Sequence, residues 1–300
     1  MKRQKTVGSR IFNFVNYTIL GLFTLLCTFP FYYVFINTIS DNRESELGRV
    51  LFWPVGIHFG NYVEVFRIDL LAGAAVVSVA RTFIGTFVTV IGTSLLGYCF
   101  SKQEMWGRTF WYRYVLVTMY FSAGIIPWFM TMRALNLTNN FLAYILPGIV
   151  APFSLILFKT YVESLPAELE ESAAMDGAGY IRRFVYIVFP LCTPIVATIA
   201  VFTSVGHWNS FMDTVLLMTR PELYTLQYVL HRYLNELNAL AQQIRQMGML
   251  DHAEMDVSRL ITPTAVRLTI TMVVTVPILF VYPFLQKYFV KGIMLGAVKG

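Results

Sequence analysis

Long apolar runs alternate with short polar segments along the whole chain. Six intervals contain no Asp, Glu, Lys or Arg, and each has at least 19 residues. A helix needs about 20 predominantly apolar residues to cross the hydrocarbon core of a bilayer. The pattern therefore predicts six membrane-spanning helices, at residues 12–36, 72–100, 114–132, 141–158, 187–212 and 268–286.

Composition favours an all-α, polytopic membrane protein. Hydrophobic residues make up 56% of the 300 residues and charged residues only 13%, which is far from the balance of a soluble domain. The longest polar segment, 213–266, is too short and too poor in aromatic residues to form a second soluble domain. Because no internal repeat or low-complexity tract is evident, the sequence predicts a single transmembrane domain over residues 1–300.

The distribution of Lys and Arg predicts the orientation of the spans. The apolar run after the basic N-terminus is too long for the hydrophobic region of a signal peptide, so we expect it to remain as the first span. If the N-terminus is cytoplasmic, the cytoplasmic segments hold 13 of the 23 Lys and Arg residues and the longer outer segments hold 8. Because cytoplasmic loops are enriched in basic residues, both termini and the loop 165–190 are predicted to be cytoplasmic. The segment 213–266 is then extracytoplasmic.

The extracytoplasmic segment carries apolar residues at helical spacing. This periodicity predicts an amphipathic helix, which either lies on the bilayer or offers a docking surface to an external partner. The residues that form the pattern are Leu226, Val229, Leu230, Tyr233, Leu234, Leu237, Leu240 and Ile244.

Several polar and aromatic side chains fall within the predicted spans. Arg81 lies near the outer end of the second span, and the favoured interpretation is that its long side chain reaches the lipid headgroups. The adjacent His207 and Trp208 are most simply explained by packing or by an interfacial aromatic belt. Sugars, however, stack on aromatic rings and hydrogen-bond to amides, so these groups are also candidates for a sugar-facing wall. The candidate substrate path comprises Arg81, Tyr120, Trp128, His207, Trp208 and Asn209.

The motifs of common enzyme classes are missing from the sequence. It contains no GxxxxGK[ST] phosphate loop, no HExxH and no GxSxG. Cys27, Cys99 and Cys192 are isolated, which indicates neither a disulfide nor a metal site. Ionisable groups, which intramembrane catalysis and proton coupling require, are scarce within the spans. We therefore expect a chain that is not an enzyme, binds no metal or cofactor and depends on an energy source elsewhere.

The loop 165–190, LPAELEESAAMDGAGYIRRFVYIVFP, is an acidic, glycine-bearing interruption between two apolar runs. Ser164 is a candidate N-cap, Pro166 suits the first turn of a helix, and Gly177 can take the left-handed conformation that ends one. Three glutamates follow Pro166, where the positive end of the helix dipole favours acids. These features predict either a short, slim helix that approaches a partner closely or a solvated connecting loop.

The same loop resembles the cytoplasmic EAA signature of ABC-importer permeases. That signature reads Glu-Ala-Ala, three residues, Gly, nine residues, then Ile, one residue, Leu and Pro. In this chain Ser172 replaces the first alanine and Phe189 replaces the leucine, while the spacing is complete. The matching positions are Glu171, Ser172, Ala173, Gly177, Ile187, Phe189 and Pro190.

The resemblance extends over nearly the whole chain and is closest to the carbohydrate-uptake branch of that family. The stretches that carry it are GTSLLGYCFSK, YFSAGIIPWF, GHWNSF and the C-terminal YPFLQKYFVKGIMLGAVKG. The last stretch is similar to permeases for complex or acidic oligosaccharides, such as alginate importers. The resemblance implies the type I ABC-importer permease fold and ATP-driven import of oligosaccharides across the bacterial cytoplasmic membrane.

The resemblance also implies partners and a role for the loop. Members of the family pair with a second permease, two cytoplasmic ATPase subunits and an extracytoplasmic solute-binding protein, and ATP and Mg act in the ATPase. The helix from Glu168 to Gly177 corresponds to the coupling helix, which sits in a groove of the ATPase and switches the pore from inward-facing to outward-facing. The implied ATPase-coupling residues are Glu168, Glu171, Ser172, Ala173, Asp176 and Gly177.

A secondary transporter or channel without an ATPase partner is the alternative function, although such proteins usually carry ionisable groups at the membrane midplane. No nucleic-acid partner is expected, and the surroundings are a lipid bilayer. The outer segments carry 8 basic and 11 acidic residues, a net charge of −3, which gives no broad attraction to a polyanion. Arg81 and Arg267 are candidates for local contacts with an acidic sugar, and the identity of the cargo stays open.

Overall fold

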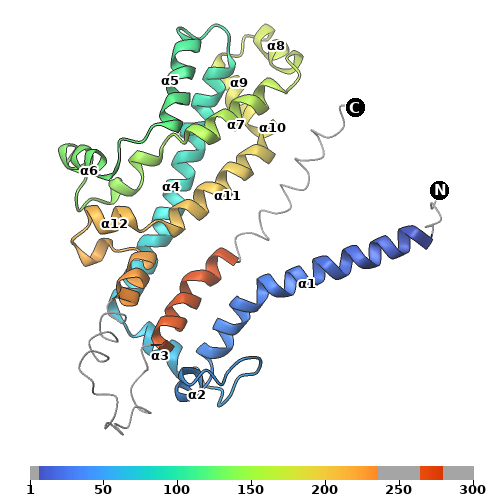
Figure 1. The fold of residues 1–300 in the computed structure, drawn as a ribbon. Helices are drawn as coiled ribbons and strands as arrows, with labels where there is room; N and C mark the ends of the chain where they lie inside the picture. The colour runs from blue at the N-terminus through green and yellow to red at the C-terminus, as the bar shows by residue number, and fades with distance from the viewer. Residues whose placement is uncertain (1–6, 236–263, 280–300) are drawn as a thin grey trace. The chain divides into compact units, whose positions relative to one another are not determined.

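The computed structural model describes residues 7–235 and 264–279, and within these ranges every regular element is helical (Figure 1). The chain divides into two compact units. Unit 1 consists of Met1–Ile68 and Tyr233–Val273, and unit 2 consists of Asp69–Arg232 and Val274–Gly300. The prediction of an all-helical chain is thus confirmed for the part of the molecule that the structure describes.

Two uninterrupted helices are long and apolar enough to cross a bilayer. They are Gly8–Thr38, with a mean hydropathy of 2.0, and Leu70–Ser101, with a mean hydropathy of 1.8. They form most of α1 (Val7–Thr38) and α4 (Asp69–Ser101), which confirms the first two predicted helices. Two bent helix pairs also meet the length and composition of a span, and a shorter apolar helix covers Thr264–Leu279. The C-terminal part of the predicted sixth helix, 268–286, lies outside the described residues.

The third predicted helix is wrong as a single element. The structure has α5 (Arg108–Tyr120) and α6 (Ile125–Ala134), separated by a short extended connection. Phe121 is extended, and Gly124 has φ 89°, which a residue with a Cβ adopts only at a steric cost. The chain therefore leaves the helix at Phe121, in the middle of an apolar run, and Gly124 supplies the turn that begins the next helix.

The fourth predicted helix is also interrupted. It begins with two short 3₁₀ turns, η1 (Phe141–Tyr144) and η2 (Leu146–Gly148), and continues as α7 (Pro152–Glu163) after a bend of 44°. Proline lacks the N–H that an α-helix needs in its interior, but it suits the first turn of a helix. Pro152 therefore starts a new helix rather than continuing the old one.

The fifth predicted helix is the most strongly bent. The helical region begins before the predicted start at residue 187, with α9 (Tyr180–Arg183) and the π-helical turn η3 (Phe184–Val188), and continues as α10 (Phe189–Leu191) and α11 (Thr193–Asn209). The axis of Tyr180–Leu191 makes an angle of 82° with that of Thr193–Asn209. The span does not continue to Met212 as predicted, because Ser210 is extended and the chain then begins the separate elements α12 (Met212–Leu217) and η4 (Pro221–Leu223).

Unit 1 pairs the exposed helix α1 with a small polar assembly at its C-terminal end. Asp41 caps the short helix α2 (Asn42–Glu46) by accepting a hydrogen bond from the N–H of Arg43 at 2.9 Å. The Nδ2 of Asn61, on α3 (Gly60–Phe66), donates to the Thr38 carbonyl at 3.0 Å and so joins α3 to the end of α1. Only 6% of the apolar window of α1 is buried, as expected of a helix whose surface meets lipid.

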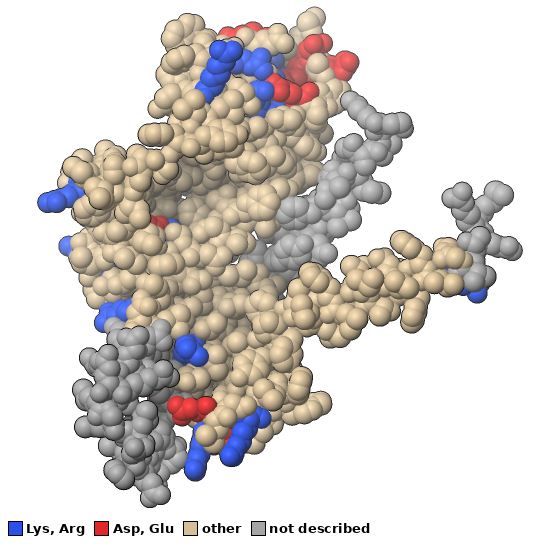
Figure 2. Space-filling model, viewed as in Figure 1, with Lys and Arg blue, Asp and Glu red and all other residues tan. Residues whose placement is uncertain are grey.

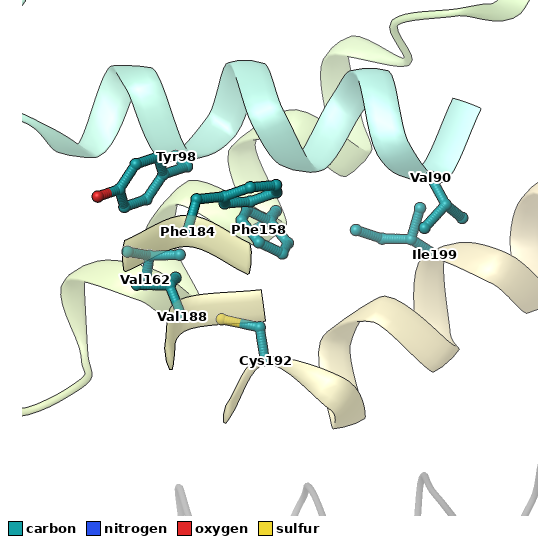
Figure 3. Close-up of a cluster of buried hydrophobic side chains, with 8 residues drawn as sticks. All are labelled: Val90, Tyr98, Phe158, Val162, Phe184, Val188, Cys192 and Ile199. Carbon is teal, nitrogen blue, oxygen red and sulfur yellow. The ribbon is translucent and has the colours of Figure 1, made fainter. Parts of the chain in front are cut away.

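Unit 2 is built around α4, against which α7 and α11 pack. The largest of these contacts form the cluster in Figure 3, where Phe158 of α7 and Ile199 of α11 are completely buried against the α4 side. Gly92 allows the close approach, because a Cβ at this position would lie 2.8 Å from the carbonyl oxygen of Ile149. Small residues let helix backbones pack closely within a membrane. The cluster comprises Val90, Tyr98, Phe158, Val162, Phe184, Val188, Cys192 and Ile199.

Candidate functional site

A short helix, α8 (Glu168–Met175), lies between α7 and α9 where the acidic loop was predicted to form one. Gly177 has φ 82°, and its N–H donates to the Ala174 carbonyl at 3.0 Å. The next N–H, of Ala178, donates to the Ala173 carbonyl at 2.9 Å. These bonds satisfy the last carbonyls of the helix in the way that a left-handed glycine permits. The predicted stop at Gly177 is confirmed.

The predicted start of this helix is wrong. Ser164 is the last residue of the preceding helix region, where its Oγ donates to the Tyr161 carbonyl at 2.7 Å. The N-cap position of α8 is Ala167, which has no side-chain oxygen. The turn at Leu165–Pro166 separates the serine from α8, so its hydroxyl bonds backward along α7 instead.

The predicted coupling residues lie together on α8 and its terminal turn. Glu168, Glu171 and Asp176 are exposed, and within the described residues none of the three forms an ion pair. Met175 is 88% exposed, although it is apolar. Ser172 is exposed as well, while Ala173 is half-buried toward the rest of unit 2. The outer face of α8, formed by these exposed residues, thus carries acidic side chains and one apolar side chain that a partner could contact.

Glu170 faces the other way and was missed by the sequence analysis. Its side chain is 16% exposed, accepts a hydrogen bond from the Tyr98 hydroxyl and forms an ion pair with Lys102. The guanidinium of Arg183 lies 3.7 Å from the same carboxylate. The signal in the sequence is Tyr98 and Lys102, both within GTSLLGYCFSK, but their partner lies about seventy residues further along the chain.

A second carboxylate nearby, that of Glu163, also binds basic side chains. Glu163 at the end of α7 accepts from Arg108 at 2.7 Å and from Lys159 at 2.7 Å. Figure 2 shows blue and red side chains concentrated at the α8 end of unit 2, next to a broad tan surface. A cavity of about 640 Å³ opens among these groups, between α8, the α4–α5 turn and α9.

A separate hollow lies deeper in unit 2. It has a volume of about 420 Å³ and is bounded by α4, α6, the 3₁₀ turns before α7, and α11. Three members of the candidate substrate path, Arg81, Trp128 and His207, line it together. Hydroxyl groups and aromatic rings share the wall with the pair of charges formed by Arg81 and Asp213. The other lining residues are Thr89, Ala143, Tyr144, Pro147, Gly148, Ala151, Ser154, Phe202, Thr203, Gly206 and Ser210.

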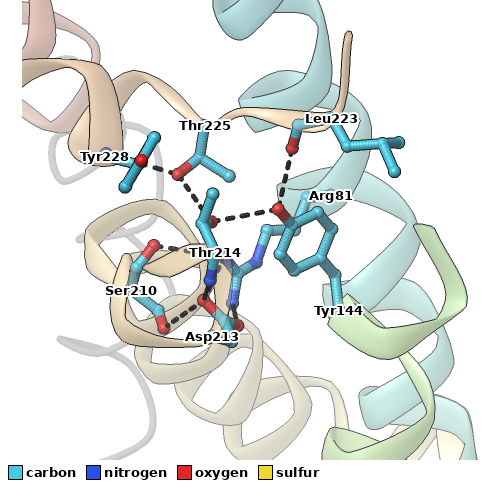
Figure 4. A network of polar contacts seen from close by, with 8 residues as sticks. All are labelled: Arg81, Tyr144, Ser210, Asp213, Thr214, Leu223, Thr225 and Tyr228. Atoms are coloured by element: carbon cyan, nitrogen blue, oxygen red, sulfur yellow. Dashed lines mark hydrogen bonds and ion pairs between the residues drawn. The ribbon is translucent and has the colours of Figure 1, made fainter. Parts of the chain in front are cut away.

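The snorkelling interpretation of Arg81 is wrong. Its guanidinium is buried, with only 3% of the residue exposed, and forms two hydrogen bonds with the Asp213 carboxylate (Figure 4). Nη1 also donates to the Ser210 carbonyl at 3.1 Å, and the guanidinium carbon lies 4.5 Å from the centre of the Tyr144 ring. A charge in a span is tolerated when it is paired within the protein. Asp213 supplies that pairing here.

Figure 4 shows that the ion pair belongs to a larger polar network. The Tyr144 hydroxyl donates to the Leu223 carbonyl at 2.7 Å and lies 3.0 Å from the Thr214 hydroxyl. The Thr214 hydroxyl lies 3.1 Å from that of Thr225. The network joins α4, η1, α12 and the segment after η4, so these elements hold one end of the hollow in a single arrangement.

Three members of the candidate substrate path do not line the hollow. Trp208 is 9% exposed and its indole N–H donates to the Val274 carbonyl at 3.0 Å, which makes it a packing residue. The Asn209 side chain is exposed and accepts from Gln227 at 3.1 Å. Tyr120 is 82% exposed at the end of α5. Consecutive side chains of an α-helix point in directions about 100° apart, so His207 lines the hollow while Trp208 of the same helix packs elsewhere.

Among the residues that the structure describes, no group of three His, Cys, Asp or Glu side chains is placed to hold a metal ion. The thiols of Cys27, Cys99 and Cys192 are all free. The donors that cluster in unit 2 are instead carboxylates neutralised by Lys and Arg, an arrangement that suits the positioning of helices.

A helical membrane protein with an exposed acidic helix and a polar hollow between broken spans has the features of a transport subunit. No family model matches the sequence. The chain is 33% identical over 292 residues to the polygalacturonan/rhamnogalacturonan transport system permease protein YtcP of Bacillus subtilis (strain 168), covering 97% of this chain and 99% of that protein. It is 32% identical over 297 residues to Protein LplC of the same organism, covering 98% and 97%.

Other similarities agree with these two. The lactose transport system permease protein LacG of Rhizobium radiobacter is 27% identical over 296 residues, which are 98% of this chain and 99% of that protein. A crystal structure of a bacterial ABC transporter involved in the import of the acidic polysaccharide alginate matches with a TM-score of 0.82 and 29% identity, over 96% of this chain and 100% of the matched chain. The chain belongs to the carbohydrate-uptake family of ABC-importer permeases, which are membrane transport components rather than enzymes. The resemblance inferred from the EAA signature is confirmed.

Proposed function

We propose that the chain is the permease subunit of an ATP-driven, binding-protein-dependent importer of oligosaccharides in the bacterial cytoplasmic membrane. The observation that carries the proposal is 33% identity to a sugar-transport permease over 97% of the chain, together with the exposed acidic helix α8 at the EAA signature. In this proposal residues 1–300 form one transmembrane domain with six spans, and both termini are cytoplasmic. The segment 213–266 is extracytoplasmic, and most of its predicted amphipathic helix, 226–244, lies outside the described residues.

The proposed partners follow from what the chain lacks and from what it exposes. A permease of an ABC importer works with an ATPase and a substrate-binding protein, and this sequence contains no phosphate loop of its own. The proposed assembly contains a second, homologous permease, two cytoplasmic ATPase subunits and an extracytoplasmic solute-binding protein. ATP and Mg act in the ATPase, and this chain binds no cofactor.

The proposed coupling site is the outer face of α8. Glu168, Glu171, Ser172 and Asp176 are exposed there, so they can meet basic and hydrogen-bonding groups of an ATPase without rearrangement. Ala173 keeps the helix slim on its inner side, and Gly177 fixes the turn that connects it to α9. When the ATPases close, α8 moves with them, and the attached spans switch the pore between inward-facing and outward-facing states.

The proposed substrate path is centred on the hollow. Trp128 offers an aromatic face for stacking on a sugar ring, and His207 offers a hydrogen-bonding nitrogen. Trp208, Asn209 and Tyr120 are not on this wall, so their proposed contribution is limited to shaping the surrounding helices. Because Arg81 is already paired with Asp213, we do not expect it to bind the carboxylate of an acidic sugar. Arg267, which is exposed, remains available for that contact.

Oligosaccharides are the proposed cargo, and acidic ones are favoured by the similarity to an importer of the acidic polysaccharide alginate. The assembled complex, reconstituted in vesicles with its binding protein, is expected to take up oligosaccharides only when ATP is supplied. Neutral and uronate oligosaccharides of equal length should be compared directly. Uptake by this chain in vesicles without nucleotide or ATPase would instead favour the alternative, a secondary transporter or channel.

The aromatic wall can be tested in the same assay. Trp128→Ala removes the stacking surface and is expected to raise the KM for sugar about fivefold, since aromatic stacking contributes on the order of 1 kcal/mol. Trp106→Ala is the matched control, because Trp106 is 84% exposed and lies outside the hollow. Equal KM values for wild type and Trp128→Ala would remove this tryptophan from the substrate path.

A further inference from the structure

Glu170 differs from its neighbours on α8 in the direction it faces. Glu168 and Glu171 are exposed, whereas the Glu170 side chain is 16% exposed and reaches toward the cytoplasmic end of α4. Within α8 only Glu170 and Ala173 are half-buried, and they lie one helical turn apart on the same face. The helix α8 thus has an outer face that is free and an inner face anchored by one carboxylate.

Two groups that bind the Glu170 carboxylate lie at the end of α4 and are held in place by their own packing. Tyr98 is 2% exposed, and its ring packs against Phe184 with centroids 5.3 Å apart, so its hydroxyl is held in place. The Lys102 ammonium lies 4.6 Å from the centre of the Tyr98 ring while it pairs with Glu170. Tyr98 lies in the last turn of α4, and Lys102 directly follows its last residue, Ser101, so both side chains reach the same carboxylate from one helix end.

The helix that receives this contact also forms a wall of the hollow. α4 is unbroken from Asp69 to Ser101 and has 33 residues, or about 50 Å at the α-helical rise. Tyr98 lies near one of its ends, and Thr89 and Arg81 line the hollow further along. Spans four and five, in contrast, are bent by 44° and 82°. α4 is therefore the straightest described element that reaches from α8 to the hollow.

We infer that Glu170 is a positioning residue that transmits the displacement of α8 to α4, and through α4 to the wall of the hollow. This inference rests on the proposed function, because the displacement is supplied by an ATPase bound to the outer face of α8. Chain continuity joins α8 to α7 and α9, whereas Glu170 joins it to a helix that is distant in sequence. Without this carboxylate, α8 moves while α4 stays behind.

The test uses the assembled, reconstituted complex and two rates measured on the same vesicles, ATP hydrolysis and sugar uptake. Glu170→Gln keeps the shape of the side chain and removes its charge. We expect the mutant to insert, to copurify the ATPase in wild-type amount and to hydrolyse ATP, but to import about tenfold less sugar per ATP, a typical size for coupling between sites. Glu104→Gln, an exposed acid on the adjoining α4–α5 turn, is the matched control and should keep the wild-type ratio.

Two further variants separate transmission from stability. Tyr98→Phe removes a single hydroxyl and keeps the packing on Phe184, so it should lower the uptake per ATP in a protein that folds normally. Lys102→Met is expected to act in the same direction, and its combination with Glu170→Gln should be no worse than the stronger single mutant, since both act on one contact. If uptake and hydrolysis fall in proportion in all of these variants, the inference is overturned and Glu170 has only a structural role.

The same experiment distinguishes failure of the inference from failure of the proposed function. A wild-type complex that takes up sugar with ATP, alongside a Glu170→Gln complex with an unchanged ratio, removes the inference and leaves the proposed function intact. A wild-type chain that copurifies no ATPase removes both.

Discussion

Arg81 illustrates how the environment of one residue decides its role. From sequence it is a basic residue near the end of a span, and such residues usually extend to the headgroups. In the structure it is buried, and its partner Asp213 lies 132 positions later in the chain. No local pattern connects the two, because they meet only when α12 folds back against α4. The other groups that bond to the carboxylate are local to it, since the Ser210 hydroxyl and the Thr214 N–H both donate to Asp213 Oδ1.

Removing one member of this pair should destabilise the protein strongly. Asp213→Leu leaves the Arg81 guanidinium buried without a counter-charge, and breaking a buried ion pair typically costs about 3–5 kcal/mol. We expect a clearly lower midpoint of thermal unfolding for the detergent-purified chain. The double variant Arg81→Met with Asp213→Leu replaces both charges by apolar groups and should recover most of the loss. A double variant that is no more stable than Asp213→Leu would contradict this account.

At the scale of single residues, the sequence predicted Gly177 correctly because a helix that must stop has few alternatives to glycine. It did not predict Glu170, since the choice of which glutamate on α8 faces inward depends on Tyr98 and Lys102 from another part of the chain. Trp128 and His207 line one wall of the hollow, whereas the Trp208 indole bonds to the Val274 carbonyl, in agreement with the packing interpretation that the sequence favoured for it.

At the scale of whole elements, the sequence predicts a helix from the length of its apolar run. Hydrophobic length located the first and second spans, α1 and α4, to within a few residues. It did not reveal the breaks in the third, fourth and fifth predicted spans, because the apolar run continues on both sides of each bend. The glycine at 124 and the prolines at 152, 190 and 194 stand at or near these breaks, so the signals were present. The packing of neighbouring helices, which the sequence does not show, decides whether a proline interrupts a helix or is accommodated within it.

Close packing of α4 gives an element-scale prediction. Gly92→Ala places a Cβ 2.8 Å from the Ile149 carbonyl, a backbone atom that cannot rotate away. Overpacking of this kind typically costs about 1–3 kcal/mol. Gly73→Ala on the same helix meets nothing within 4 Å and should leave stability unchanged or slightly raised, since alanine is the better helix former. Thermal unfolding of the two variants side by side distinguishes them, and equal midpoints would argue against tight packing at Gly92.

The turn after α8 gives a second element-scale prediction. Gly177 has φ 82° and donates its N–H to Ala174, whereas proline is fixed near −65° and has no N–H. Gly177→Pro should therefore reorient α8 and abolish ATP-dependent uptake in a chain that still inserts into the membrane. Gly179→Ala is the matched control, because Gly179 has φ −68° and open space around it. Normal uptake by Gly177→Pro would defeat the assignment of this helix to coupling.

For the whole molecule, the arrangement in the membrane is the central prediction. Charged side chains gather around α8 at one end of unit 2, and basic residues outnumber acidic ones in the full chain by a net charge of +6. The positive-inside rule, applied to the Lys and Arg residues of the segments between the predicted spans, predicts that the α8 end is cytoplasmic. The family could be predicted from the EAA signature, because the spacing of its residues is set by the helix α8 and the turn at Gly177. The number of spans is less evident, since the third, fourth and fifth predicted helices are interrupted in the structure.

Cysteine labelling tests this orientation directly. In a background in which Cys27, Cys99 and Cys192 are serine, Met175→Cys introduces a thiol at an 88% exposed position. We expect a membrane-impermeant maleimide to label it in inside-out vesicles that lack the ATPase and not in right-side-out vesicles. Glu222→Cys, which lies on the exposed η4 turn, should show the opposite pattern. Labelling of both from the same side would invalidate the proposed topology.

The 82° bend at Cys192 has a mechanical consequence. When α11 stands across the bilayer, Tyr180–Leu191 must run nearly parallel to the membrane surface. In a stiff corner of this kind, a displacement of the short arm along the membrane normal tilts the long arm sideways within the bilayer. Because Thr193–Asn209 is longer than Tyr180–Leu191, the far end of the long arm then moves further than the end that is displaced.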